Sequence, residues 1–125
     1  RFKQYNDRHG HLAGDAALQG LASVFDECLR QRVDSAYRIG GDEFASLLIE
    51  ADADQALRVA ERIRTAFEDR HLNGCTVSIG LAGLLPDEAP TDLLRRADRS
   101  LYTAKRAGGN RIEISPGSAD DVSSP

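Results

Sequence analysis

The sequence predicts an α/β domain in which helices cover a sheet. Three observations support this class: apolar residues recur at helical spacing in long segments, short segments are rich in β-branched and aromatic residues, and the two kinds of segment alternate along the chain. The chain has 125 residues, of which 41% are hydrophobic, and this is enough for one core. We therefore expect one globular unit.

The first half of the chain predicts a helix, a hairpin and a second helix. Residues 14–30 carry apolar side chains on one helical face, so they predict the first helix. Residues 35–39 and 43–49 have strand composition and flank Gly40-Gly41-Asp42, which predicts a β-hairpin with a tight glycine turn. A second helix is expected over 53–70, with Asp52 or Asp54 as its N-cap.

The second half continues the alternation. Residues 75–82 are β-branched and aliphatic and predict a buried strand. After a break at 84–90, Thr91 or Asp92 is the expected cap of a third helix, which ends near Ala107 before two glycines. Residues 111–115 predict a last short strand, whereas 116–125 have the composition of a disordered tail or linker. The expected domain is thus 1–115, followed by a tail at 116–125.

Charge and cysteine usage exclude several classes of function. The net charge is -4 with both signs mixed, so the chain has no basic field for a nucleic acid, although a small anionic ligand remains compatible. Cys28 and Cys75 lack metal-ligand spacing and are expected to be buried thiols in a reducing compartment. No run approaches the ~20 apolar residues of a membrane span. We expect a cytoplasmic domain, which could belong to a membrane-anchored protein.

The turn after Ile39 carries the most distinctive chemistry. Asp42 and Glu43 follow Gly40 and Gly41 directly, and glycine lets another molecule approach the main chain closely. The two adjacent acids repel each other, and Mg²⁺ would relieve this repulsion while bridging to phosphate oxygens. An ordinary exposed turn is the simpler alternative. Arg38 shares a strand face with Gly40, so it is expected to point toward a ligand or a neighbouring acid, or to form a structural salt bridge.

The turn belongs to a longer set of matching segments. From residue 2 to about residue 114 the sequence resembles the GGDEF family of diguanylate cyclases in five segments, in the family's order: 1–7 with 10–15, 40–44, 76–80, 96–105 and 110–111. The resemblance implies an α+β fold of the nucleotidyl-cyclase or palm-like type, with a central, mostly antiparallel sheet covered by helices. It also implies that the family's first strand, whose end carries a metal-binding aspartate, lies before Phe2. The chain is thus expected to be a truncated piece.

The same resemblance implies a guanine contact and a metal site. Asn6 and Asp15 would hydrogen-bond the guanine edge, which suits an amide with both donor and acceptor and a carboxylate that accepts N–H groups. The alternatives are that Asn6 ends a local turn and that Asp15 caps the first helix. Asp42 would bind Mg²⁺ or Mn²⁺, and Glu43 would be a metal ligand or a base for the attacking 3′-hydroxyl.

Further residues are implied as phosphate contacts. The main chain at Gly40 and Gly41 would approach the nucleotide, and the amides of Phe2 and Lys3 would hold the triphosphate with the ammonium of Lys105. Lys105 is alternatively an exposed residue favoured by the helix dipole. A basic residue that many relatives carry is replaced here by Gly109.

The implied reaction joins two GTP molecules into cyclic di-GMP and releases pyrophosphate. Two domains would face each other, so catalysis requires a homodimer, normally driven by an upstream sensory or receiver domain. Without the first strand, catalysis is not expected from these 125 residues alone.

The family's product-inhibition motif, arginine-x-x-aspartate, maps to Asp34 and to Gln31 in place of the arginine. Arg30 and Arg32 flank that position, but side chains leaving at different angles would substitute poorly. We expect weak or absent feedback binding. The alternatives to a cyclase are a non-catalytic module that binds GTP or cyclic di-GMP as a regulatory receptor, and a structural dimerisation domain.

Overall fold

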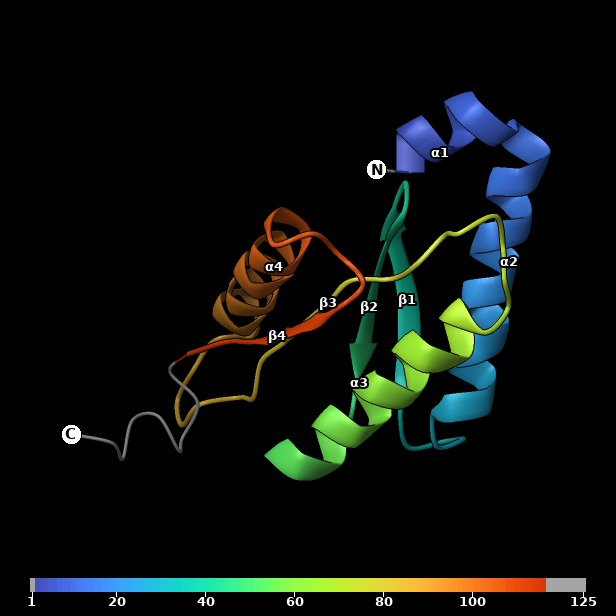
Figure 1. The fold of residues 1–125 in the computed structure, drawn as a ribbon. Coiled ribbons are helices and arrows are strands. Elements are labelled where there is room, and N and C mark those ends of the chain that lie inside the picture. The colour runs from blue at the N-terminus through green and yellow to red at the C-terminus, as the bar shows by residue number, and fades with distance from the viewer. Residues whose placement is uncertain (1, 117–125) are drawn as a thin grey trace.

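The computed structural model describes residues 2–116 and shows helices and strands alternating along the chain (Figure 1). This mixed helix and sheet content confirms the predicted class. The elements are α1 (Phe2–His9), α2 (His11–Cys28), β1 (Ser35–Gly40), β2 (Glu43–Leu47), α3 (Ala53–Glu68), β3 (Ile79–Leu81), α4 (Pro90–Arg106) and β4 (Ile112–Ile114). The expected tail lies outside the described residues, apart from Pro116.

The chain starts with a helix that the sequence pattern did not indicate. α1 is strongly polar and has no apolar stripe, so periodicity does not reveal it. Gly10, with φ 89°, separates α1 from α2 and is the N-cap of α2 without a side-chain hydrogen bond. α2 therefore starts at His11, and the expectation that Asp15 caps this helix is wrong because Asp15 lies inside it. Asn6 likewise lies within α1 and does not end a turn.

The predicted hairpin is present, with an irregular pairing near its turn. β1 and β2 are antiparallel, and the register runs from Ser35 opposite Leu47 to Arg38 opposite Phe44. It then shifts between Arg38 and Gly40, where Gly40 lies opposite Glu43. The Phe44 ring lies 5.7 Å from the Phe25 ring of α2, measured between centroids, so one face of the hairpin packs on that helix.

The two later helices start in different ways. At α3 the Asp52 carboxylate accepts from the Gln55 amide at 2.8 Å, while the Gln55 side chain accepts from the Asp52 amide at 2.9 Å. This reciprocal capping box confirms Asp52 as the cap. α4 starts at Pro90, and its N-cap Ala89 makes no side-chain bond, so Thr91 and Asp92 are not caps. The fixed φ of proline suits the first helical position.

The strands form two separate ladders and not one central sheet. β1 pairs with β2, whereas β3 pairs in parallel with β4. Among residues 2–116 no strand lies between the two ladders. The predicted strand over 75–82 is shortened to β3, because its partner β4 covers only Ile112–Ile114 and the residues before Ile79 have no ladder to join. Gly80 is needed here, since a Cβ would overlap the Ala97 and Leu101 backbone of α4.

The main core lies between α2 and α3. Its buried side chains come from both helices, and Val24 is completely covered. Phe44 of β2 and Ile79 of β3 pack against this cluster, so both ladders rest on it. Cys28 and Cys75 are free thiols. The buried residues of this core are Ala17, Leu21, Val24, Cys28, Ile63 and Phe67.

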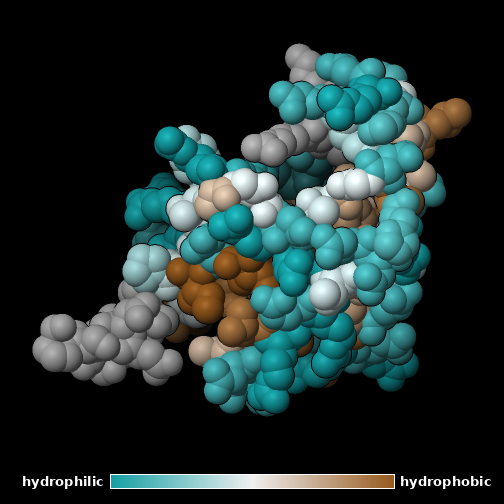
Figure 2. Space-filling model, in the orientation of Figure 1, coloured by the Kyte–Doolittle hydropathy of each residue, from teal (hydrophilic) through white to brown (hydrophobic). Residues whose placement is uncertain are grey.

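The surface of the view in Figure 2 is mostly hydrophilic. Apolar side chains gather in one area of that face, between β4 and α3. Over residues 2–116 no helix has the length and apolar character that a membrane span requires.

Candidate nucleotide-binding site

The turn between β1 and β2 is held by an arginine. Gly41 has φ 51°, a left-handed conformation that favours glycine. The Arg38 guanidinium donates to the Gly41 carbonyl from Nε at 2.9 Å and from Nη2 at 2.6 Å. Arg38 is thus bound to the turn's main chain, and this contact replaces the ion pair with a neighbouring acid that alternation suggested.

The two acids of the turn are left for another partner. Asp42 is exposed and Glu43 is half-buried at the start of β2. Neither carboxylate is paired by a hydrogen bond or salt bridge with the rest of residues 4–116. Adjacent carboxylates without a cation fit a hard metal ion, which is usually held by one or two carboxylates and by substrate phosphates. The described residues contain no cluster of three acids, histidines or cysteines, so further ligands would have to complete such a site.

Asn6 carries an unusual polar atom. Its Oδ1 is buried and has no hydrogen-bond partner among the described residues. A buried acceptor without a partner costs about 1–3 kcal/mol, so such an atom needs an explanation. A ligand that donates a hydrogen bond would supply one. Asn6, the predicted base contact, lies in α1.

The loop between α3 and β3 connects α1 to the turn. The Tyr5 hydroxyl of α1 donates to the Leu72 carbonyl at 3.2 Å and accepts from the Asn73 amide at 3.3 Å. Further along this loop, burial raises the pKa of the Cys75 thiol, and the negative charge of Asp42 raises it further. Asp42 and α1 therefore both lie close to this loop, and Figure 1 shows α1 and the hairpin tip at the same end of the molecule.

The remaining predicted residues have less direct support. α1 starts at Phe2, so the amides of Phe2 and Lys3 lie at a helix N-terminus, a position that favours phosphate. The side chains of these two residues lie outside the description. Asp15 is exposed on α2, and Lys105 is half-buried in the last turn of α4. Neither the Asp15 nor the Lys105 side chain hydrogen-bonds or forms an ion pair with Asp42 or Asn6.

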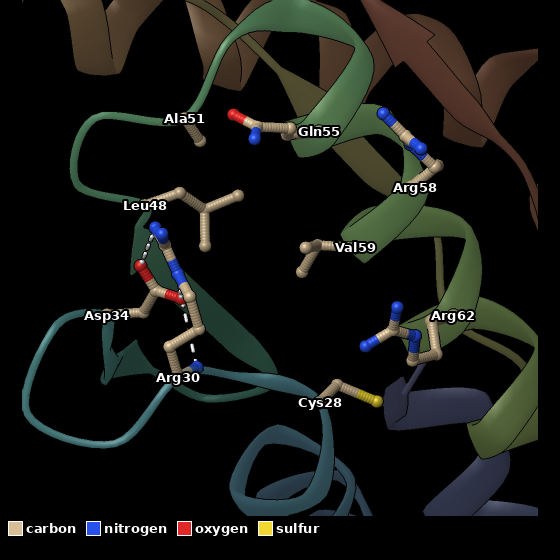
Figure 3. Close-up of a pocket in the computed structure, with 9 residues that line it drawn as sticks. All are labelled: Cys28, Arg30, Asp34, Leu48, Ala51, Gln55, Arg58, Val59 and Arg62. Carbon is tan, nitrogen blue, oxygen red and sulfur yellow. Dashed lines mark hydrogen bonds and ion pairs between the residues drawn. The ribbon is translucent and has the colours of Figure 1, made fainter.

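A cavity of about 310 Å³ lies at the other end of the hairpin, between it and α3 (Figure 3). Arg30 and Asp34 line one side, and Arg58 and Arg62 of α3 line the other. Arg58 and Arg62 belong to no sequence motif, and only their four-residue spacing, which places them on one helix face, relates them in the sequence. Gln31, the residue at the family's arginine position, is not among the lining residues.

Arg30, the neighbour of Gln31, forms an ion pair with Asp34. Its Nη2 lies 2.8 Å from Asp34 Oδ1 and its Nε donates to Asp34 Oδ2 at 3.0 Å. The same Nη2 donates to the Ile49 carbonyl at 2.6 Å. These hydrogen bonds lower the pKa of Asp34 to about 2. The loop after α2 thus directs the Arg30 guanidinium toward the Asp34 carboxylate.

Known proteins resemble this chain in sequence and in fold. Residues 1–111 match the family model described as the diguanylate cyclase GGDEF domain. Diguanylate cyclase A of Treponema denticola is 38% identical over 121 residues, which cover 91% of this chain and 32% of that protein. The coiled coil and GGDEF domain of DgcB from Caulobacter crescentus, solved in complex with c-di-GMP, matches with a TM-score of 0.84 and 32% identity over 92% of this chain and 64% of that one.

A second solved structure agrees. The active GGEEF domain of a diguanylate cyclase from Vibrio cholerae matches with a TM-score of 0.83 and 33% identity, covering 94% of this chain and 78% of that one. The glycine–acid hairpin and the mixed helix and sheet fold define a nucleotidyl-cyclase type of domain. The chain belongs to the GGDEF domain family of diguanylate cyclases. It spans about a third of the curated relative's length.

Proposed function

We propose that this chain is the GTP-binding half-site of a diguanylate cyclase, which joins two GTP molecules into cyclic di-GMP with release of pyrophosphate. The observation that carries the proposal is the convergence of two features on one loop. Tyr5 of α1 hydrogen-bonds Leu72 of the loop between α3 and β3, and the Asp42 charge raises the pKa of Cys75 in the same loop. The unpartnered Oδ1 of Asn6 lies on α1, and Glu43 follows Asp42 in the chain. An intact family signature at these positions supports the same function.

Guanine recognition falls to α1 and α2 in this proposal. Asn6 Oδ1 accepts a hydrogen bond from the guanine edge, which removes the cost of its burial. Asp15, exposed on α2, accepts from N1–H and the exocyclic amine, and adenine offers no matching pair of donors. Guanine is thereby selected over adenine.

The phosphates are held at the start of α1. The free amides of Phe2 and Lys3 point along the helix axis, and the positive end of the helix dipole favours anions. Lys105 adds a cation from the last turn of α4. Gly40 and Gly41 allow the main chain of the hairpin to come close to the nucleotide, because no side chain stands in the way.

Asp42 and Glu43 would hold Mg²⁺ or Mn²⁺, since their carboxylate oxygens suit a hard cation and have no other cationic partner among the described side chains. When bound, the metal supplies charge neutralisation on the phosphate oxygens. Glu43 at the start of β2 accepts the proton of the attacking 3′-hydroxyl. The domain's main contribution is orientation of two reactants, which lowers the entropic cost of their encounter.

Each reaction needs a second copy of the domain. One chain holds one GTP, and the hydroxyl that attacks it comes from the GTP of the partner, so the active unit is a homodimer. Since the chain covers 32% of its curated relative, an upstream sensory or receiver domain that drives this pairing is part of the proposal. The reaction takes place where GTP is available, in the cytoplasm.

Product formation by the full-length protein tests this proposal. We would incubate it with GTP and Mg²⁺ and separate cyclic di-GMP and pyrophosphate by chromatography. Glu43→Gln is expected to lower product formation at least ~100-fold while GTP binding persists. The matched control is Glu61→Gln, an exposed acid on α3 that should retain activity. Absence of product from the parent, with GTP bound, would reject catalysis.

A second candidate function is a regulatory receptor for cyclic di-GMP. It is favoured by the cavity between α3 and the end of the hairpin opposite its turn. Its arginines suit phosphates, and the DgcB structure was solved with c-di-GMP. Arg30 already donates from Nε and Nη2 to Asp34 and Ile49, so a ligand would have to break these bonds. We therefore still expect weak binding. Calorimetric titration with cyclic di-GMP measures it, and tight binding to a protein without cyclase activity would favour the receptor.

A further inference from the structure

The Arg38 side chain hydrogen-bonds the main chain of the turn, a contact that is neither a salt bridge nor part of a substrate site. It leaves β1 before the register shift and reaches past Gly40 to the carbonyl of Gly41. Two nitrogens of one planar guanidinium converge on this single oxygen, at 2.9 and 2.6 Å. The pairing Gly40 opposite Glu43 leaves the Gly41 carbonyl in the two-residue turn, outside the ladder. Arg38 thus supplies the partner that the irregular hairpin does not.

The carbonyl that Arg38 holds is directly linked to the first catalytic acid. The Gly41 C=O and the Asp42 N–H belong to the same planar peptide unit, so fixing one fixes the direction of the other. Gly41 has no Cβ to limit its backbone, and its φ of 51° is one of many values it can adopt. Without a restraint the turn would sample several peptide orientations, and the Asp42 carboxylate would move with them.

We propose that Arg38 is a positioning residue, which acts through the Gly41–Asp42 peptide to aim the Asp42 carboxylate at the metal. The inference rests on the proposed metal role of Asp42 and revises the expectation that Arg38 contacts substrate. Glu43 starts β2 and is fixed by the ladder, whereas Asp42 lies in the turn. The backbone of Glu43 is therefore held by the ladder, whereas the backbone of Asp42 is held by the Arg38 contact with Gly41.

The test compares Arg38→Ala and Arg38→Lys with Arg95→Ala, a control arginine on α4 whose side chain is 73% exposed. In the full-length protein, Arg38→Ala is expected to lower kcat ~10-fold or more and to raise the Mg²⁺ concentration for half-maximal rate, with the GTP dissociation constant changed less than ~3-fold. Lysine, a point charge without the planar fork, should rescue only partly. Arg95→Ala should match the parent.

A measurement without turnover separates this inference from the cyclase proposal. Mn²⁺ broadens amide NMR signals near its site, and we expect broadening at Asp42 in the parent that weakens in Arg38→Ala at equal Mn²⁺. This outcome supports the inference even if the protein makes no cyclic di-GMP. Retained kcat and metal dependence in Arg38→Ala, or a loss confined to GTP affinity, would overturn it. A loss confined to GTP affinity would indicate that Arg38 contacts the substrate.

Discussion

Replacing Asp34 by asparagine tests the energetic role of the ion pair at the foot of the hairpin. The Asp34 side chain is only 1% exposed and accepts from Arg30 and from the amide of Ile49 at 3.2 Å. These bonds connect the segment after α2, the residue before β1 and the segment after β2. Asparagine keeps the shape but offers one acceptor and places an N–H₂ group against donors. Asp34→Asn should therefore loosen the open end of the hairpin.

The size of the effect follows from the pKa of Asp34, which falls from 3.8 to about 2 because Arg30 hydrogen-bonds the carboxylate. Each pKa unit corresponds to about 1.4 kcal/mol, which sets an upper limit of about 2.5 kcal/mol. The Arg30 side chain is 51% exposed, so solvent screens the pair and we expect about 1 kcal/mol. Because the folded pKa is depressed, this stability is present above pH 3.8 and is lost as the pH falls toward 2.

Urea unfolding at pH values from 6 to 2 measures this contribution. The parent should exceed Asp34→Asn in free energy of unfolding at pH 6, and the difference should shrink toward pH 2. Glu88, whose pKa is also lowered to about 2 by Arg96, titrates in the same range. The comparison therefore uses the difference between the two proteins, with Glu88→Gln as a reference. A difference that stays constant with pH would refute the reasoning.

Three further perturbations have clear expected results. Gly80→Ala should disrupt the packing of β3 on α4, because its Cβ would overlap the backbone of Ala97 and Leu101. Gly20→Ala should destabilise the protein less, because its Cβ would approach the flexible end of Leu72 at 2.9 Å. Thermal unfolding compares the two variants. Asp52→Ala removes the capping box of α3 and should cost ~1 kcal/mol by urea unfolding, a value near zero arguing against the cap. Arg96→Gln leaves Glu88 without its partner at 2.6 and 2.7 Å, so amide exchange in the loop before α4 should accelerate; unchanged exchange would contradict this.

The sequence predicts the elements that have their own local signal. The apolar stripe of α3, its Asp52 cap and the glycine turn of the hairpin are all present as expected. α1 escapes prediction because a short polar helix carries no periodicity, and it is fixed by Tyr5 contacts far along the chain. The division into two ladders also depends on long-range pairing, which local patterns do not encode.

The sequence indicates which residues belong to the candidate site better than it indicates what their side chains contact. The acids of the turn and Asn6 belong to recognisable motifs, so the sequence alone marks them as candidates. What Arg38 contacts was not, because side-chain alternation gives a face of the strand and not a partner across a register shift. The Arg30–Asp34 pair was not predicted either, because the geometry of the loop after α2 determines where the Arg30 side chain points.

The position of α3 has a consequence for how the molecule unfolds. α3 packs on α2, the helix that contacts the hairpin, and it also contacts β3. Two side chains of α3 hydrogen-bond Asn110: Arg64 donates to it at 3.2 Å, and Glu68 accepts from it at 2.5 Å. β3, α4 and β4 contact mainly one another. We therefore expect two cooperative units that share α3 as their common wall. Loss of this one helix would release both units, and its amides should exchange only when the whole domain opens.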